Sequence, residues 1–292
     1  MADGYLDRLA ARTAAVGSVL CVGLDPDPGD VPAELGHGLE GIERFARLVL
    51  EAATPAAAAI KANLAFFEAY GATGIAVLER LRAAVPTNVP FIADAKRGDV
   101  SSTAARQAVA LLDRLGADAV TLSPYLGRDA IAPFLERADG FAYVLCRTSN
   151  PGAGELQDLV VPPDAELDAP AEPLWARVAR RTAAWDPGGR LGLVVGATGP
   201  AELAEARRIV PGLAFLVPGV GAQGGSAETV LQAGQATAPP AGGRTGGGLL
   251  VNVSRAISRA AGDTSGEGAA ADPGERLAAA ARAWSARLPV LP

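Results

Sequence analysis

The sequence contains few of the residue types on which metal enzymes and covalent catalysts depend. Its 292 residues include one histidine, His37, two cysteines and one methionine, and aromatic residues make up only 5%. A histidine-based metal centre lacks ligands, and a serine or cysteine nucleophile lacks a histidine at a strand end to activate it. We therefore expect no cofactor and no metal site, although these counts leave metal binding by carboxylates alone open.

Long apolar runs and an excess of positive charge are also missing. No run reaches the roughly 18 apolar residues that a membrane span needs, and no apolar core of a signal peptide begins the chain. The formal net charge of −6 disfavours nucleic acid and anionic membranes as partners. Cys21 and Cys146 lie in separate apolar runs, where buried thiols are expected rather than a disulfide. Together these features predict a cytoplasmic protein.

Short runs rich in Val, Ile and Leu recur along the chain, and each is followed by a stretch with helical periodicity. This is the pattern of parallel strands joined by crossover helices. The predicted strands are Val19–Asp25, Ala57–Asn63, Pro90–Lys96, Ala119–Pro124, Gly140–Thr148, Leu191–Ala197, Ala214–Gly219 and Gly248–Ser254. The predicted helices are Ile42–Ala53, Gly74–Val85, Ser102–Leu115, Asp129–Arg137, Leu174–Trp185, Ala201–Ile209 and Ala227–Gln232.

Such alternation predicts an α/β fold of the (β/α)₈ type, the TIM barrel. The alternative is an open doubly wound sheet, which would need a glycine-rich dinucleotide turn after its first strand. The segment Gly23-Leu24-Asp25-Pro26 is not such a turn. We therefore expect one barrel domain over residues 1–292, with a rim insertion at about 150–173, a compositionally biased loop at 235–248 and an outer C-terminal helix at about 272–288.

Charged residues fall at the C-terminal ends of the first three predicted strands, where barrel enzymes place their chemistry. They are Asp25, Lys61, Asp94 and Lys96. Asp94 and Lys96 are two apart on one strand, so their side chains share a face, and Lys61 enters from the neighbouring strand. An ion-pair cluster that only closes the barrel mouth is the alternative, but buried ion pairs add little stability, which favours a functional site. Asp99 follows Gly98 and begins the next loop.

The motif Asp94-x-Lys96-x-x-Asp99 resembles the signature of the orotidine 5′-monophosphate decarboxylases. Other segments resemble blocks of this family in the right order: Asp25, Lys61-Ala62-Asn63, Thr103, Ser149-Asn150-Pro151-Gly152-Ala153, Pro218 to Gly225, and Asn252-Val253-Ser254-Arg255. The triplet alone also occurs in a wider group of sugar-phosphate barrels, whereas the ordered set is specific. The chain length and the Ser-Asn-Pro-Gly-Ala segment resemble a longer bacterial subgroup, type 2.

The resemblance implies decarboxylation of orotidine 5′-monophosphate to UMP without a cofactor. Loss of CO₂ leaves a carbanion at C6 of the pyrimidine, which the fixed ammonium of Lys96 would stabilise and then protonate. Asp94 would lie near the departing carboxylate. Asp99 would orient the lysine from the other subunit of a homodimer with shared active sites.

The remaining candidates are assigned to parts of the substrate by the same resemblance. Asp25 and Lys61 would bind the ribose hydroxyls, with Thr103 of the partner subunit, and Ser149 the pyrimidine. Arg255 would bind the phosphate, together with Gln223 in the glycine-rich turn that begins at Pro218. As alternatives, Arg255 is a surface residue at a helix start, Ser149 a loop cap and Thr103 an ordinary first-turn residue.

Two other functions remain to be weighed. A sugar-phosphate decarboxylase or aldolase of the same barrel group would use Mg²⁺ to stabilise an enediolate, and it carries an acidic residue where this chain has Lys61. A non-catalytic phosphate-binding barrel would bind ligand without turnover. The presence of both Asp94 and Lys96 of the motif argues against this non-catalytic alternative.

Overall fold

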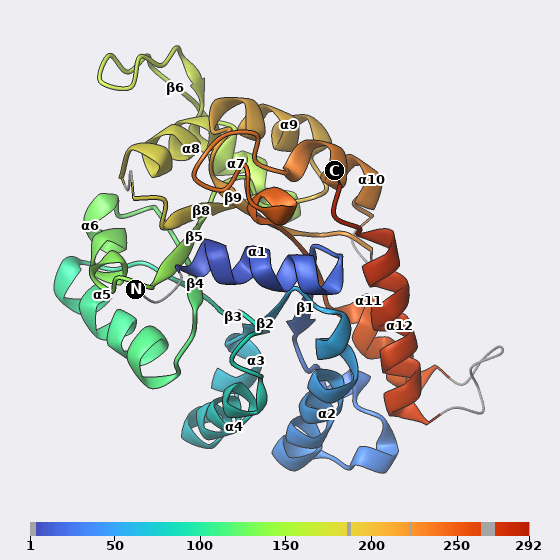
Figure 1. Cartoon of the computed structure of the whole chain (residues 1–292). Coiled ribbons are helices and arrows are strands. Elements are labelled where there is room, and N and C mark those ends of the chain that lie inside the picture. The colour runs from blue at the N-terminus through green and yellow to red at the C-terminus, as the bar shows by residue number, and fades with distance from the viewer. Residues whose placement is uncertain (1–3, 186–187, 222–223, 264–271, 292) are drawn as a thin grey trace.

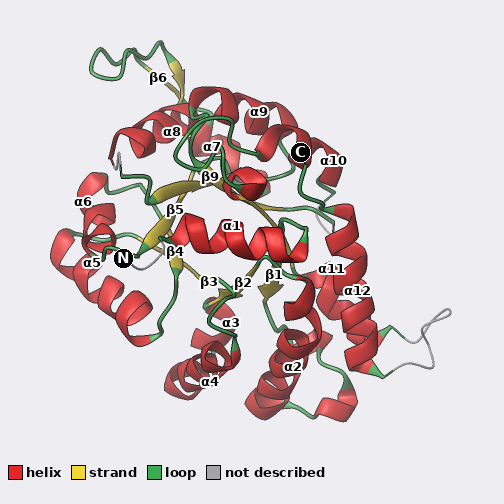
Figure 2. Cartoon of the chain, in the orientation of Figure 1, coloured by secondary structure: helices red, strands yellow, loops and turns green. Residues whose placement is uncertain are grey.

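The barrel predicted from the sequence is confirmed. The computed structural model describes residues 4–185, 188–221, 224–263 and 272–291, and its eight parallel strands close in the order β1-β10-β9-β8-β5-β4-β3-β2 (Figures 1 and 2). The barrel strands are β1 Leu20–Leu24, β2 Ala59–Asn63, β3 Phe91–Arg97, β4 Ala119–Leu122, β5 Phe141–Leu145, β8 Leu191–Val194, β9 Ala214–Pro218 and β10 Leu249–Val253. Each lies within or overlaps one of the predicted apolar runs.

The strands are apolar on both faces because each face meets a different core. In β1, Leu20, Val22 and Leu24 face outward and pack under the helices, whereas Cys21 points into the barrel. Within the barrel, Cys21 packs with Ile92 of β3 and other inward-facing side chains. Parallel strands covered on both sides therefore read as continuous apolar runs, the pattern from which they were predicted.

Helices surround the strands, as Figure 2 shows. They are α1 Tyr5–Val16, α2 Gly38–Ala53, α3 Ala65–Glu68, α4 Gly71–Ala84, α5 Ser101–Ala108, α6 Arg128–Ile131, α7 Gly154–Gln157, α8 Leu174–Trp185, α9 Pro200–Ile209, α10 Ala227–Gly234, α11 Arg255–Ser258 and α12 Pro273–Arg287. α12 packs against α2 on the outside of the barrel. Among the described helices, none combines the length and apolarity needed to cross a membrane.

Two stretches predicted as continuous α-helices each begin as an α-helix and continue as a different type of helix. The stretch predicted as Ser102–Leu115 is α5 followed by a π-helical turn, Val109–Arg114. The stretch predicted as Asp129–Arg137 is α6 followed by a 3₁₀ helix, Ala132–Glu136. Pro133 lies at the start of this 3₁₀ helix and lacks the N–H group that a continuing α-helix would use.

The helix α1, which was not predicted, closes the N-terminal end of the barrel (Figure 1). The Tyr5 ring stacks on Phe141, the first residue of β5, with ring centroids 4.5 Å apart. The Tyr5 and Tyr143 hydroxyls lie 3.1 Å apart, within hydrogen-bond distance. The biased loop 235–248 lies at the same end, where Arg244 Nε donates to Asp7 Oδ1 of α1 at 2.8 Å. With this end covered, the open mouth is the one formed by the C-terminal ends of the strands.

The insertion after β5 forms a small hairpin on the rim. Its strands β6 Val160–Val161 and β7 Glu172–Pro173 pair antiparallel and form a two-stranded sheet separate from the barrel. Figure 1 shows this hairpin projecting beside α8.

Candidate active site

A cavity of about 550 Å³ opens at the C-terminal ends of the barrel strands. Most of the side chains selected from the sequence line it: Asp25, Lys61, Asp94, Lys96, Ser149, Pro218 and Arg255. Asp99 and Thr103 do not line it. Gln223 lies outside the described residues. Because the C-terminal ends of all barrel strands meet at one mouth, the fold brings together residues that are separated by up to 230 positions in the chain.

Asp94 lies between the two lysines at the floor of the cavity. Its Oδ2 accepts a hydrogen bond from Lys61 Nζ at 2.7 Å, and its Oδ1 accepts one from Lys96 Nζ at 2.6 Å. Lys61 and Asp94 are buried, whereas the Lys96 side chain is 51% exposed and faces the open space. The arrangement is an alternating row of charges in which one ammonium group stays accessible to a ligand.

The electrostatics of the row keep its buried members ionised. Burial by itself would raise the pKa of Asp94, but the charges of Lys61 and Lys96 and their hydrogen bonds hold it well below the ordinary value. Burial would lower the pKa of Lys61, but the charges of Asp94 and Asp25 raise it above its ordinary value. Asp94 is therefore a carboxylate and Lys61 an ammonium at neutral pH.

The backbone of β3 departs from a regular strand at Lys96. Ala93 pairs with Val120 but Arg97 with Leu122, so β3 carries extra residues in a bulge, and Lys96 has a φ of +47°. Asp94 and Lys96 lie on one strand and their side chains meet in the cavity, but the backbone between them is irregular, which the sequence analysis did not indicate. A non-glycine residue in this region costs about 1–3 kcal/mol, which the surrounding contacts must offset.

Thr121 of β4 supports this bulge, and the sequence analysis did not select it. Its hydroxyl accepts a hydrogen bond from the Lys96 backbone N–H at 3.0 Å and donates one to Asp94 Oδ1 at 2.8 Å. The signal for it was a polar residue at an inward position of an otherwise apolar strand, two places after Ala119. Thr121 thereby links the backbone of one charged residue to the side chain of the other.

Other polar side chains complete the wall around Lys61. Asp25 Oδ1 lies 3.9 Å from Lys61 Nζ and has no hydrogen-bond partner within the described part of the chain. Asn252, 8% exposed, lines the same wall from β10, with Ser254 beyond it. Sequence reasoning placed Asn252 and Ser254 only within a motif and gave them no role. These groups form a polar wall suited to hydroxyl groups of a ligand.

The cationic end of the cavity is formed by Arg255, the first residue of α11. Pro218, Gly219 and Val220 line the cavity beside it. Gly219 has a φ of +102°, a conformation that favours glycine and lets the backbone turn sharply after β9. A guanidinium beside a glycine-containing turn is an arrangement that suits a phosphate group.

Asp99 and Thr103 lie beyond the bulge. Asp99 Oδ1 accepts a hydrogen bond from the backbone N–H of Val100 at 2.7 Å, and Thr103 is exposed on α5. Val100, Tyr125 and Leu126 are exposed apolar side chains on the loops after β3 and β4. The structure of the single chain does not bring Asp99 and Thr103 into the cavity.

The described residues contain no group of three or more His, Cys, Asp or Glu side chains arranged to hold a metal ion. His37 is exposed and directly precedes α2.

Comparisons with known proteins identify a family and several relatives of this chain. The model of the orotidine 5′-phosphate decarboxylase / HUMPS family matches residues 18–270. An orotidine 5′-phosphate decarboxylase of Roseiflexus castenholzii is 46% identical over 97% of this chain and 94% of its own, and one of Thermomicrobium roseum is 44% identical over 97% and 93%. The structure of Leishmania donovani OMP decarboxylase is 38% identical, with a TM-score of 0.78 and 97% of each chain covered.

Proposed function

The chain belongs to the orotidine 5′-phosphate decarboxylase / HUMPS family, and on this premise we propose how its cavity converts orotidine 5′-monophosphate to UMP. The observation that carries the proposal is the Lys61–Asp94–Lys96 row, in which the only exposed member is the ammonium of Lys96. The reaction needs a positive charge and a proton at one carbon atom, and this lysine supplies both.

The bond from C6 of the pyrimidine to its carboxylate breaks, CO₂ leaves, and the electron pair stays on C6. Lys96 Nζ stabilises the developing charge and transfers a proton to C6, after which the lysine regains a proton from water. The bulge and the hydrogen bond to Asp94 fix this side chain before substrate arrives. A preorganised charge lowers the barrier because little reorientation is needed during the reaction.

Asp94 and Lys61 act around this centre. Asp94 accepts a hydrogen bond from Lys96 Nζ, which orients the lysine, and it lies near the departing carboxylate. Asp25 and Lys61 bind the ribose hydroxyls along the polar wall, where Asp25 has an oxygen without a hydrogen-bond partner among the described residues. The placement of sugar and base then brings C6 over Lys96.

Recognition of the two ends of the nucleotide falls to different loops. Arg255 and the turn from Pro218 bind the phosphate, joined by Gln223, and Ser149 binds the pyrimidine. The phosphate is remote from the reacting carbon, so its binding energy is available to close the loops and exclude water.

A homodimer with shared active sites accounts for the position of Asp99 and Thr103 outside the cavity of their own chain. Both lie outside the cavity of their own subunit, and the exposed Val100, Tyr125 and Leu126 lie near them. In the proposed dimer this apolar surface is covered, and the partner's Asp99 and Thr103 reach Lys96 and the ribose.

We place the enzyme in the cytoplasm. Cys21 and Cys146 are buried thiols, and burial raises the pKa of each to about 12, which keeps them protonated and unreactive. Two thiols kept apart in this way suit a reducing compartment.

The test is decarboxylation by purified protein in the presence of EDTA, followed by the loss of orotate absorbance and the appearance of UMP. We expect full activity with EDTA, because no step requires a metal. Lys96→Ala should lower kcat by at least about 1,000-fold, since both the charge and the proton donor are lost. Absence of turnover by the unmodified chain would contradict the function, and near-normal turnover by Lys96→Ala would contradict the role of the lysine. Loss of activity with EDTA would instead favour the Mg²⁺-dependent enzymes of this barrel group.

A further inference from the structure

The short helix α7 begins the rim insertion, and its last residue, Gln157, lines the active-site cavity. Both ends of the Gln157 side-chain amide contact Thr148, and its Oε1 also accepts a longer hydrogen bond from Arg147 Nη1 at 3.4 Å. Its Oε1 accepts a hydrogen bond from the Thr148 backbone N–H at 2.9 Å, and its Nε2 donates to Thr148 Oγ1 at 2.8 Å. Thr148 Oγ1 in turn donates to Asn150 Oδ1 at 2.6 Å. Gln157 therefore holds Thr148 directly, and through the Thr148 hydroxyl it is linked to Asn150 on the other side of Ser149.

The neighbouring contacts hold the same loop from other directions. Arg147 Nη2 forms an ion pair with Asp158 Oδ2 at 3.1 Å, directly after α7. The backbone N–H of Gly196 donates to the Arg147 carbonyl at 2.7 Å. Gly196 lies so close to Ser149 that an added Cβ would be 2.9 Å from the serine backbone nitrogen. Ser149 is thus fixed between the end of β8 and the insertion.

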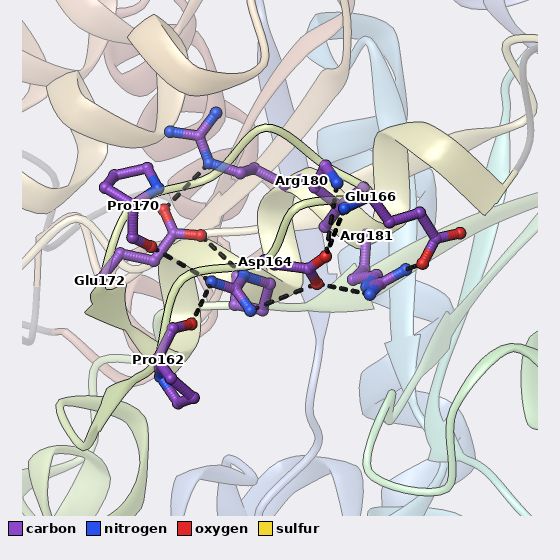
Figure 3. A network of polar contacts seen from close by, with 9 residues as sticks. Pro162, Asp164, Glu166, Pro170, Glu172, Arg180 and Arg181 are labelled. Carbon is purple, nitrogen blue, oxygen red and sulfur yellow. Dashed lines mark hydrogen bonds and ion pairs between the residues drawn. The ribbon is translucent and has the colours of Figure 1, made fainter.

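The hairpin that follows α7 in the insertion is anchored to α8 by a network of ion pairs and hydrogen bonds (Figure 3). Arg177 Nε donates to Glu172 Oε1 at 2.8 Å, and Arg180 Nε donates to Glu172 Oε2 at 2.9 Å. Asp164 accepts hydrogen bonds from Arg177 and Arg181. Glu172 is only 6% exposed, which shields these ion pairs from solvent. Three arginines of α8, Arg177, Arg180 and Arg181, thereby hold the hairpin in place.

We propose that Gln157 is a positioning residue that fixes the Thr148–Asn150 loop for recognition of the pyrimidine. The inference rests on the proposed function, because it takes Ser149 as the contact to the base. A loop that is already ordered loses little conformational entropy when the nucleotide binds, whereas a loop released from Gln157 must be ordered at that moment. The insertion thus acts on substrate affinity through α7.

The experiment compares Gln157→Ala and Gln157→Glu with the matched control Gln232→Ala, which removes an exposed amide on α10. Inhibition constants are measured for UMP and for ribose 5-phosphate, which has the same sugar and phosphate but no base. We expect Gln157→Ala to raise Ki for UMP and KM for the substrate about tenfold and to leave Ki for ribose 5-phosphate unchanged. Gln157→Glu keeps the acceptor for the Thr148 N–H but loses the donor, so its effect should be intermediate. Gln232→Ala should match the unmodified chain.

A second substitution separates positioning from general damage. Thr148→Val removes the hydroxyl that Gln157 holds, so adding Gln157→Ala to it should cost less than Gln157→Ala alone costs. Equal weakening of UMP and ribose 5-phosphate, or unchanged constants for both, would overturn the inference. Failure of the unmodified chain to decarboxylate the nucleotide would contradict the proposed function, whereas normal turnover with no effect of Gln157→Ala would contradict this inference alone.

Discussion

Lys61 and Lys96 are the two lysines of the whole sequence, and every other basic side chain in it, His37 apart, is an arginine. Arginine serves wherever a positive charge is enough, because its guanidinium keeps its protons throughout the accessible pH range. A group that must give up a proton cannot be an arginine. This argument applies to Lys96, the proton donor of the proposed reaction, and the other lysine, Lys61, lies beside it in the same cavity.

Because the sequence has only two lysines, the protonation of each can be followed by its own NMR signal. In protein labelled with ¹³C at lysine Cε, two side-chain signals are expected, and Lys61→Arg assigns them. Because Asp94 and Asp25 raise the pKa of Lys61, its signal should not titrate until the pH exceeds the ordinary value of about 10.4. The stability that this ammonium contributes is fully present below about pH 10.4 and is lost as the pH rises through its folded-state pKa.

Asp94→Asn should move the Lys61 transition to lower pH, because the principal opposing charge is removed while burial remains. Asp113→Asn is the matched control, since it makes the same change in an exposed ion pair with Arg137 far from the lysines. A Lys61 signal that titrates below the ordinary value in the unmodified chain would contradict the charge row described above.

At the scale of elements, α1 and the loop 235–248 close the end of the barrel opposite to the chemistry. The pattern that indicates α1 is present in the sequence, since its buried residues Tyr5, Leu6, Leu9 and Thr13 recur with helical spacing. The helix precedes the first strand and therefore lies outside the repeating units from which the barrel was predicted. Its packing partners include Tyr143 and Phe141, more than 120 residues away.

Leu9→Ala tests whether α1 contributes to the stability of the fold without affecting catalysis at the opposite end of the barrel. Leu9 is 1% exposed in the core inside the barrel, so its truncation leaves a cavity and should lower the free energy of unfolding by about 2–5 kcal/mol. KM and kcat per folded molecule should not change, because α1 lies at the other end of the strands. Urea unfolding and steady-state kinetics measure the two effects, with Ala14→Ser on the exposed face of α1 as the control. A loss of kcat/KM without a loss of stability would contradict this division.

Across the whole barrel, residues that lie at strand ends could be grouped from the sequence, because their positions depend only on the order of the strands. Contacts between loops, and between a loop and a neighbouring strand, could not be predicted. Parallel strands bring their C-terminal ends to one mouth whatever lies between them, so Asp25, Lys61 and Asp94 could be grouped from position alone. The bulge at Lys96 depends on the hydroxyl of Thr121, on another strand. The contact of Gln157 with Thr148 depends on how an insertion folds back over its own loop. No spacing rule in the sequence specifies such contacts.

The proposed dimer makes the active site a property of two chains. Each site would combine Lys96 of one subunit with Asp99 of the other. This explains why the motif Asp94-x-Lys96-x-x-Asp99 is compact in sequence while Asp99 does not line the cavity of its own subunit. The exposed Val100 next to Asp99 and the exposed Tyr125 and Leu126 on the adjacent loop supply apolar surface for the contact.

Mixed dimers test this arrangement. Lys96→Ala and Asp99→Ala are produced in one cell with different affinity tags, and dimers that carry both tags are isolated. In such a dimer one site has lost both residues, while the other combines an intact Lys96 with an intact Asp99 from the partner subunit. We expect about half the kcat of the unmodified dimer, although each variant alone is strongly impaired. If Lys96 and Asp99 acted within one subunit, both sites of the mixed dimer would be defective and no activity would return.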